Sequence, residues 1–156
     1  SPARGVPLGE RRAFLERHEP AARAHLGDSL MDALLAFVSE GVAAPTWPHQ
    51  PVWCHGDLHA ANLTLDADGT VGVLDFDDLT SGDPAVDLRF LWLVLDEAQR
   101  EESRETLEAS GAYDPGIWVR ARGWAASSFV IPVAADPQGR VAFADAVEHA
   151  VTQLLG

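Results

Sequence analysis

A set of three polar residues in the middle of the chain constrains the fold more than any other feature. Asp57 is followed five residues later by Asn62, and Asp75 lies thirteen residues beyond that asparagine. An Asp-Gly pair at 68–69 is typical of a hairpin turn, because these residues readily adopt positive φ. We therefore expect a tight β-hairpin with Asn62 at its entrance and Asp75 at its exit, so that the two side chains lie close together. The short apolar stretches that we expect to be strands are 52–54, 63–65 and 71–74.

These residue types in this order suit the transfer of a phosphoryl group. The reaction needs a carboxylate that accepts or orients the acceptor hydroxyl, and oxygen ligands that hold Mg²⁺ on the nucleotide phosphates. Asp57 suits the first role because it follows a short strand, in a loop that a hydroxyl can reach. Asn62 and Asp75 suit the second role, and Asp77 could add a direct or water-mediated contact to the metal. Each of these residues alone could simply cap a turn, but the whole set at this spacing favours chemistry.

The rest of the chain predicts helices around the hairpin. With 156 residues, the chain fits one domain with a sizeable core. Apolar residues recur at helical spacing on both sides of the hairpin, so the fold class is α+β and mostly helical. The helix after Asp83-Pro84 is apolar on nearly every face and should be buried. The expected helices run over 9–27 with a break near Pro20, from Asp28 or Ser29 to Gly41, from Asp83 to Leu95, over 100–109, from Asp114 onward, and over 141–155.

Charge and composition limit the partners. The net charge is −13, and residues 55–156 carry six arginines against eighteen acidic residues. Such an acidic surface would repel phosphates, which argues against a nucleic-acid partner. It could attract metal ions and a cationic substrate, or it could only keep the protein soluble. No stretch is long enough to span a membrane, and the single cysteine, Cys54, fits a reducing cytoplasm.

Three segments together resemble one protein family. They are residues 55–62 (HGDLHAAN), 74–77 (LDFD) and 82–88 (GDPAVDL). This combination resembles the aminoglycoside phosphotransferase and choline kinase-like family. Members have a protein-kinase-like fold and use ATP or GTP with Mg²⁺ to phosphorylate hydroxyls of small molecules. The resemblance implies that Asp57 is the catalytic aspartate and that Asn62 and Asp75 are the magnesium ligands.

The resemblance also implies roles for residues around the catalytic loop. His55 is similar to the family residue that braces this loop, and Asp87 to a buried acid that accepts hydrogen bonds from it. Asp87 opens an otherwise apolar helix, so it must be paired if it is buried. Its alternative role is that of a first-turn acid favoured by the helix dipole. His59 could face the acceptor site, or it could only contribute packing.

One part of the family pattern is missing from this chain. Family members carry an N-terminal lobe with a sheet, a phosphate-covering loop and a lysine that contacts the nucleotide. The fifty residues before the catalytic loop predict helices, no GxGxxG loop occurs, and the chain contains no lysine. We therefore interpret residues 1–156 as a single domain, the C-terminal lobe, without the nucleotide-binding lobe. The apolar surface that such a lobe would expose makes a homodimer plausible.

The acceptor and two other functions stay open at this stage. The acceptor could be an aminoglycoside, another antibiotic, a choline-like alcohol, an amino alcohol or a sugar. A non-enzymatic, pseudokinase-like binding module is the main alternative, because part of the catalytic apparatus is missing. A metal-dependent phosphoesterase is a third possibility, since Asp57-Leu58-His59 has the Asp-x-His form of a dinuclear site. That site would require further clusters of ligands, which the spacing of the other histidines does not provide.

Overall fold

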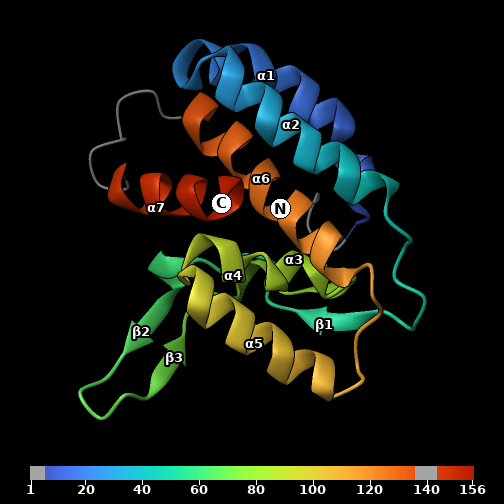
Figure 1. The fold of residues 1–156 in the computed structure, drawn as a ribbon, viewed down its shortest axis with the longest axis vertical. Coiled ribbons are helices and arrows are strands. Elements are labelled where there is room, and N and C mark those ends of the chain that lie inside the picture. The colour runs from blue at the N-terminus through green and yellow to red at the C-terminus, as the bar shows by residue number, and fades with distance from the viewer. Residues whose placement is uncertain (1–5, 136–143) are drawn as a thin grey trace.

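One long helix, α6 (Ile117–Ala135), organises the domain, as the computed structural model shows (Figure 1). The structure describes residues 6–135 and 144–156, with side chains for 6–130 and 148–156. Helices α1 (Arg12–Leu26) and α2 (Asp28–Ala43) pack against one side of α6, and the short helix α3 (Ala85–Leu88) packs against it from another direction. Helix α7 (Ala144–Leu155) contacts both α6 and the short helix α4 (Phe90–Leu93).

The core lies where these helices meet. Its buried side chains come from α1, α2, α3, α4, α6 and α7, as the apolar spacing predicts. Helices α2 and α6 approach closely because each has a glycine at the crossing, Gly41 and Gly123. A Cβ added to Gly41 would lie 3.1 Å from the Cα of Gly123. The largest fully buried side chains include Trp124, Met31, Leu34, Leu91 and Ile117.

The first helical region differs from expectation at Pro20. A short 3₁₀ helix, η1 (Leu8–Arg11), leads into α1, which continues through Pro20 without ending. Proline removes one backbone donor and usually breaks a helix, so a break was the natural expectation, and it is wrong. Pro20 itself is exposed, while Leu15 and Ala22 on either side of it are buried in the core. The packing of these flanking residues holds the helix together despite the missing hydrogen bond.

Four short strands form two separate antiparallel pairs. Strands β2 (Leu63–Leu65) and β3 (Val71–Val73) make the expected hairpin, with Leu63 opposite Val73. Strand β1 (Val52–Cys54) was also expected, but its partner β4 (Thr80–Gly82) was not. Thr80-Ser81-Gly82 has none of the alternating apolar residues that indicate a strand. The β1–β4 pair closes a loop over residues 55–79, which contains all of the predicted catalytic and metal-binding residues.

The later helices follow the sequence with small differences. The apolar helix expected after Asp83 is split at Arg89 into α3 and α4, and α5 (Glu97–Ala109) starts with a capping box at Asp96. The expected side-chain cap of α2 is wrong, because Gly27 occupies that position and Asp28 instead pairs with Arg23. Residues 141–143 of the last expected helix lie outside the described residues. Among the described residues, no helix has the length and apolar character to cross a membrane.

Candidate active site

The loop that follows β1 is shaped by Gly56. This residue has a φ of 83°, and a Cβ at its position would lie 2.4 Å from the carbonyl oxygen of Asp78. Only glycine tolerates both the positive φ and the close approach of the backbone. The loop then enters a short 3₁₀ helix, η2 (Ala60–Asn62), which leads directly into the hairpin. Gly56 therefore sets the position of Asp57 relative to the hairpin.

Asp87 holds this loop through its side-chain carboxylate. Its Oδ2 accepts a hydrogen bond from the backbone N–H of His55 at 2.7 Å, and its Oδ1 accepts one from Gly56 at 2.8 Å. The two loop residues precede Asp87 by about thirty positions, and the contacts link the first turn of α3 to the strand end. A carboxylate that accepts two amide hydrogen bonds forms strong, charge-assisted contacts. The contact expected from the sequence resemblance is thus present, and its contribution to catalysis stays a prediction.

We expect Asp87→Ala to lower the free energy of unfolding by about 3 kcal/mol, because two backbone donors lose a charged acceptor. Asp87→Asn should cost less, since its side chain keeps one acceptor oxygen. Urea denaturation followed by circular dichroism measures both changes. An Ala variant as stable as the Asn variant would show that the hydrogen bond retained by Asn contributes nothing to stability.

His55 connects the loop to the end of the hairpin. Its Nε2 donates to the carbonyl oxygen of Leu74 at 2.7 Å, and its Nδ1 accepts from the backbone N–H of Asp57 at 3.2 Å. A carbonyl can only accept and an amide N–H can only donate, so the two contacts assign the neutral ring with its hydrogen on Nε2. The ring also lies 4.8 Å from that of Phe76. His55 therefore fixes Asp57 and the residue before Asp75 with respect to each other.

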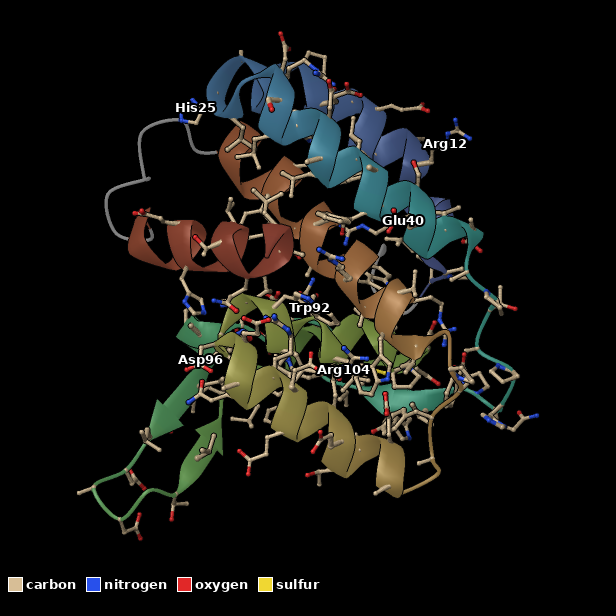
Figure 2. All side chains as sticks on the ribbon, in the orientation of Figure 1. Arg12, His25, Glu40, Trp92, Asp96 and Arg104 are labelled. Carbon is tan, nitrogen blue, oxygen red and sulfur yellow. The ribbon has the colours of Figure 1, made fainter. Side chains whose placement is uncertain are left out.

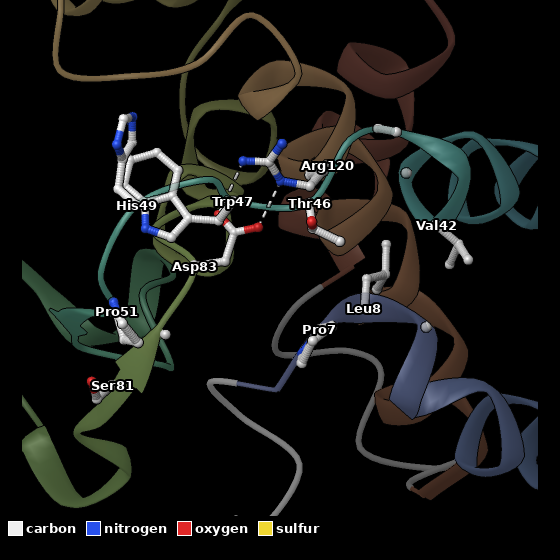
Figure 3. A pocket seen from close by; sticks show the side chains of 14 residues that line it. Pro7, Leu8, Val42, Thr46, Trp47, His49, Pro51, Ser81, Asp83 and Arg120 are labelled. Atoms are coloured by element: carbon white, nitrogen blue, oxygen red, sulfur yellow. Dashed lines mark hydrogen bonds and ion pairs between the residues drawn. The ribbon is translucent and has the colours of Figure 1, made fainter.

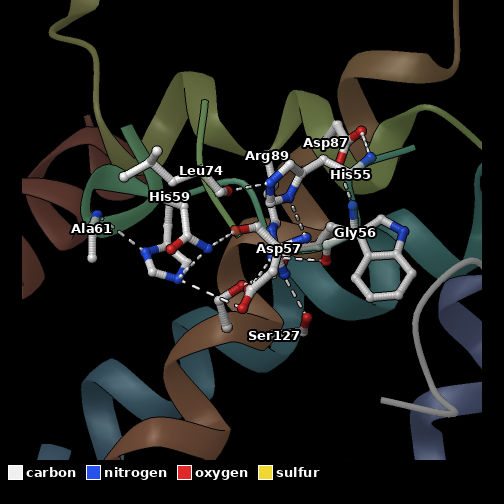
Figure 4. A network of polar contacts seen from close by, with 12 residues as sticks. His55, Gly56, Asp57, His59, Ala61, Leu74, Asp87, Arg89 and Ser127 are labelled. Carbon is white, nitrogen blue, oxygen red and sulfur yellow. Dashed lines mark hydrogen bonds and ion pairs between the residues drawn. The ribbon is translucent and has the colours of Figure 1, made fainter. Parts of the chain in front are cut away.

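The carboxylate of Asp57 is paired with Arg89 (Figure 4). The Arg89 NH2 group lies 3.0 Å from Asp57 Oδ1 and also donates to the carbonyl oxygen of Gly56. Arg89 is almost fully buried, with 6% of its side chain exposed, whereas 26% of the Asp57 side chain remains exposed. The buried guanidinium favours the ionised carboxylate and holds its direction. Asp57 is thus anchored from inside the domain and still accessible from outside.

His59 lies beside the same carboxylate. Its Nδ1 accepts from the backbone N–H of Ala61 at 3.2 Å, which places the ring hydrogen of the neutral form on Nε2. Nε2 lies 3.6 Å from Asp57 Oδ2, and the Nδ2 group of Asn62 is 3.4 Å away. The side chain is part of the polar network around Asp57, so packing alone does not describe it.

Asn62 and Asp75 are brought together by the hairpin backbone. The N–H of Leu74 donates to the carbonyl oxygen of Asn62 at 2.9 Å, and Asp75 follows directly. The Asn62 Nδ2 group donates to the carbonyl oxygen of Asp57, so that its Oδ1 is the side-chain atom left to bind a cation. Asp75 is exposed, has a φ of 58°, and begins the 3₁₀ helix η3 (Phe76–Asp78). Left-handed backbone at a residue other than glycine is uncommon and often marks a functional site.

The donor atoms at this end of the hairpin fit Mg²⁺. Amide and carboxylate oxygens are the ligands that this ion prefers. The Asp75 Oδ1 accepts a long, 3.4 Å hydrogen bond from the N–H of Asp77, and the exposed Asp77 carboxylate lies nearby in sequence. Within the described ranges, no group of three or more His, Cys, Asp or Glu side chains is gathered for a metal.

Cys54 lies next to the loop but is not a nucleophile. It is buried as a free thiol, and its side chain points toward the carbonyl oxygens of Val52 and Asp83. Burial, assisted by the charges of Asp87 and Asp83, raises the pKa of Cys54 to about 12. A buried thiol with so high a pKa carries almost no thiolate at neutral pH and is unreactive. Its role is that of a small core residue.

Comparisons with known proteins identify the family of this chain. The model of the phosphotransferase enzyme family matches residues 2–124, which is most of the chain. The chain belongs to this family. Among solved structures, a crystal structure of spectinomycin phosphotransferase APH(9)-Ia, in complex with ADP and spectinomycin, is similar with a TM-score of 0.53 and 14% identity. The similarity covers 99% of this chain and 50% of that one, so the chain spans about half the length of the solved structure. No curated protein sequence matches.

Two buried, ion-paired arginines of this phosphotransferase-family chain were not found from the sequence. Arg89 interrupts an apolar helix and is buried, and the rule that a buried charge needs a partner would have identified it. Arg120, on α6, is also buried and forms ion pairs of 2.6 Å with both Asp83 and Asp114. Figure 3 shows Asp83 and Arg120 together at a cavity of about 260 Å³. Asp83 and Asp114 were expected only to start helices, so their second role as ion-pair partners was missed.

Proposed function

We propose that this chain is the catalytic lobe of a small-molecule kinase, which transfers the γ-phosphoryl group of ATP or GTP to a hydroxyl group. One observation carries the proposal. The Asp57 carboxylate is held by Arg89 on a loop that His55 joins to the hairpin, where Asn62 and Asp75 lie at adjoining backbone positions. Membership of a phosphotransferase family supports the same reaction class.

The residues of this chain have separate tasks in the proposed step. The acceptor oxygen forms a bond to the γ-phosphorus while the bond from that phosphorus to the β–γ bridging oxygen breaks, with its electron pair leaving on the nucleoside diphosphate. The hydroxyl proton passes to Asp57, whose direction Arg89 maintains. Asn62 and Asp75 would hold Mg²⁺, with Asp77 as a further oxygen donor. When bound, the ion supplies positive charge that offsets the charge of the phosphate oxygens.

We also propose that a nucleotide-binding lobe outside these 156 residues completes the enzyme. The chain spans half of the similar solved structure, and it contains no lysine to contact the phosphates. Large apolar side chains on β1, the hairpin and η3 are exposed, and Trp53 is the most extreme with 77% of its surface accessible. Exposed apolar side chains of this kind commonly mark contact surfaces. The others in this part of the chain are Val52, Leu65, Val71, Val73, Leu74, Phe76 and Leu79.

We propose a small molecule with a free hydroxyl as the acceptor, and the acidic surface favours a cationic one. The solved phosphotransferase is in complex with ADP and spectinomycin, which supports a nucleotide donor and a small acceptor here. A reducing cytoplasm is the compartment that suits the free thiol of Cys54.

A screen for ADP or GDP release by the full-length protein with amino alcohols, sugars and aminoglycosides tests the proposal. Binding of Mg²⁺-nucleotide without turnover on any acceptor would favour the binding-module alternative.

We expect Asp75→Ala to weaken binding of the Mg²⁺-nucleotide complex by the full-length protein about 10-fold or more. The free energy of unfolding should change little, because the Asp75 side chain is exposed. Isothermal titration calorimetry in Mg²⁺ and in EDTA separates the metal-dependent part. Asp66→Ala, at an exposed position in the same hairpin, is the matched control and should bind normally. Equal affinities for the two variants would put the metal site elsewhere.

A further inference from the structure

The imidazole ring of His59 is held beside Asp57 by the start of the short helix η2. His59 is the residue before this helix, and its Nδ1 accepts a hydrogen bond from the backbone N–H of Ala61 at 3.2 Å. This contact fixes the ring and leaves its other nitrogen, Nε2, facing the Asp57 carboxylate (Figure 4). The side chain of His59 is 38% exposed and that of Asp57 is 26% exposed. A molecule from solution can therefore reach both groups.

The surroundings of the ring decide which nitrogen carries the hydrogen of the neutral form. Two donors lie close to it, the N–H of Ala61 at Nδ1 and the Nδ2 group of Asn62, 3.4 Å from Nε2. A neutral ring can accept at only one nitrogen. The Asp57 carboxylate lies on the Nε2 side, where it would repel a lone pair and attract an N–H. The hydrogen therefore belongs on Nε2, and Asn62 donates instead to the carbonyl oxygen of Asp57 at 2.9 Å.

The two facing atoms are too far apart to bond to each other directly. Asp57 Oδ2 and His59 Nε2 are separated by 3.6 Å, and a hydrogen bond needs about 3.2 Å or less. One oxygen atom can nevertheless lie about 2.8 Å from both atoms at the same time. Such an oxygen must donate to the carboxylate and accept from the imidazole N–H. A hydroxyl group meets both demands, because it has one donor and two lone pairs.

We propose that His59 contacts the acceptor and selects a hydroxyl as the reacting group, an inference that rests on the proposed phosphoryl transfer. The hydroxyl donates its hydrogen to Asp57 and accepts from His59 Nε2 with one lone pair, so its second lone pair attacks the γ-phosphorus. As this bond forms, the bond from the phosphorus to the β–γ bridging oxygen breaks, and its electron pair leaves on the nucleoside diphosphate. The hydroxyl proton passes to Asp57, and His59 keeps its own hydrogen throughout.

The same N–H keeps an ammonium group out of the reacting position. An ammonium carries only donors, and it would form a charge-assisted hydrogen bond with the Asp57 carboxylate if nothing opposed it. Beside His59 Nε2 it would place one donor against another. Selectivity of this kind comes from a penalty on the wrong group. In acceptors that carry both groups, such as amino alcohols and aminoglycosides, His59 thereby directs the hydroxyl to the transfer position.

Two substitutions separate this contact from the capping of η2. His59→Asn keeps an acceptor for the N–H of Ala61, because asparagine is a good N-cap, but it has no atom at the place of Nε2. His59→Gln reaches that place with an amide N–H. His25→Asn is the matched control, since His25 is exposed at the end of α1 (Figure 2).

The test uses the full-length protein with Mg²⁺-ATP and no added acceptor, so that water takes the place of the hydroxyl. We expect His59→Asn to lower the rate of ADP release roughly 3- to 10-fold, the effect of one hydrogen bond. His59→Gln should recover most of this loss, and the affinity for Mg²⁺-ATP should be unchanged in both variants. Propylamine, an ammonium compound without a hydroxyl, should inhibit His59→Asn at concentrations that leave the unchanged protein active. His25→Asn should behave as the unchanged protein does in each measurement.

Failure of this inference differs from failure of the proposed function. If ADP release is unchanged in His59→Asn but lost in Asp57→Asn, the role of His59 is wrong and the phosphoryl transfer stands. An equal loss of rate in His25→Asn also contradicts the role of His59. If the unchanged protein releases no ADP, both proposals are wrong. Nitrogen-15 NMR of the histidine rings in the full-length protein is a check that needs no turnover. We expect the hydrogen of the neutral His59 ring on Nε2, and a hydrogen on Nδ1 would overturn the contact.

Discussion

In the full-length protein, Asp57→Asn is expected to lower kcat by about 10²–10⁴-fold, the usual contribution of a positioned general base. The amide can no longer accept the hydroxyl proton. It also loses the charge that pairs with the buried Arg89. The affinity for Mg²⁺-nucleotide should change little, because Asn62 and Asp75 are retained. Initial rates of ADP release, with nucleotide affinity measured separately, test both parts of this expectation.

Asp66→Asn is the matched control for this variant. It makes the same chemical change in an exposed acid of the hairpin, and kcat should stay within a factor of two. Because the loss of the Arg89 partner could also loosen the loop, urea denaturation of both variants is needed. Turnover by Asp57→Asn at the rate of the unchanged enzyme would remove Asp57 from the proposed role.

The largest effect on stability is expected at Arg120. Arg120→Met should lower the free energy of unfolding by roughly 3–5 kcal/mol, because it leaves two partly buried carboxylates without their cation. Arg120 joins Asp83, before α3, to Asp114, before α6, and its NH1 also donates to the carbonyl oxygen of Pro45. Three segments that are distant in sequence therefore lose a common partner. Denaturant unfolding of the 156-residue chain measures the change.

Acid unfolding provides an independent check on the same ion pairs. Hydrogen bonding to Arg120 lowers the pKa of Asp114 below its ordinary value. A carboxyl group with a lowered pKa in the folded state stabilises the protein above its unfolded pKa of about 4, and this contribution is lost as the pH falls toward the folded pKa. Stability of the unchanged chain should therefore fall below pH 4 more steeply than that of Arg120→Met. Arg12→Met, an exposed control, should keep the steep dependence.

The hairpin could be expected from the sequence because its cause is local, whereas the contact of Asp87 with the loop was implied by the family resemblance. An Asp-Gly pair between apolar runs specifies the turn, and an acid at the start of an apolar helix calls for a partner. The β4 strand could not be expected, because its pairing with β1 comes from tertiary packing over three residues with no pattern of their own. The continuity of α1 through Pro20 has the same origin, since the buried residues on both sides outweigh one lost hydrogen bond.

The contacts of the buried arginines are the part of the structure that the sequence alone does not predict. The need for a partner at Arg89 follows from the same rule that was applied to Asp87, but the identity of that partner, 32 residues earlier, does not. Arg120 likewise reaches Asp83, 37 residues earlier, only because α6 packs against α3, whereas its other partner, Asp114, is close to it in sequence. Arg100 and Arg122 come from α5 and α6, and only the arrangement of these helices in three dimensions brings both to one cavity.

The pairing of β1 with β4 helps to keep the whole candidate site in place, and it consists of only a few contacts. Asp57, Asn62 and Asp75 all lie in the stretch that begins after Cys54 and ends before Thr80, and these two residues face each other in the strand pair. Fraying of that pair would loosen all of them together and leave the segment held by Asp87 and Arg89, while α1, α2 and α6 kept their mutual packing. The helical part can thus act as a permanent frame, and the catalytic segment as one unit that loosens locally.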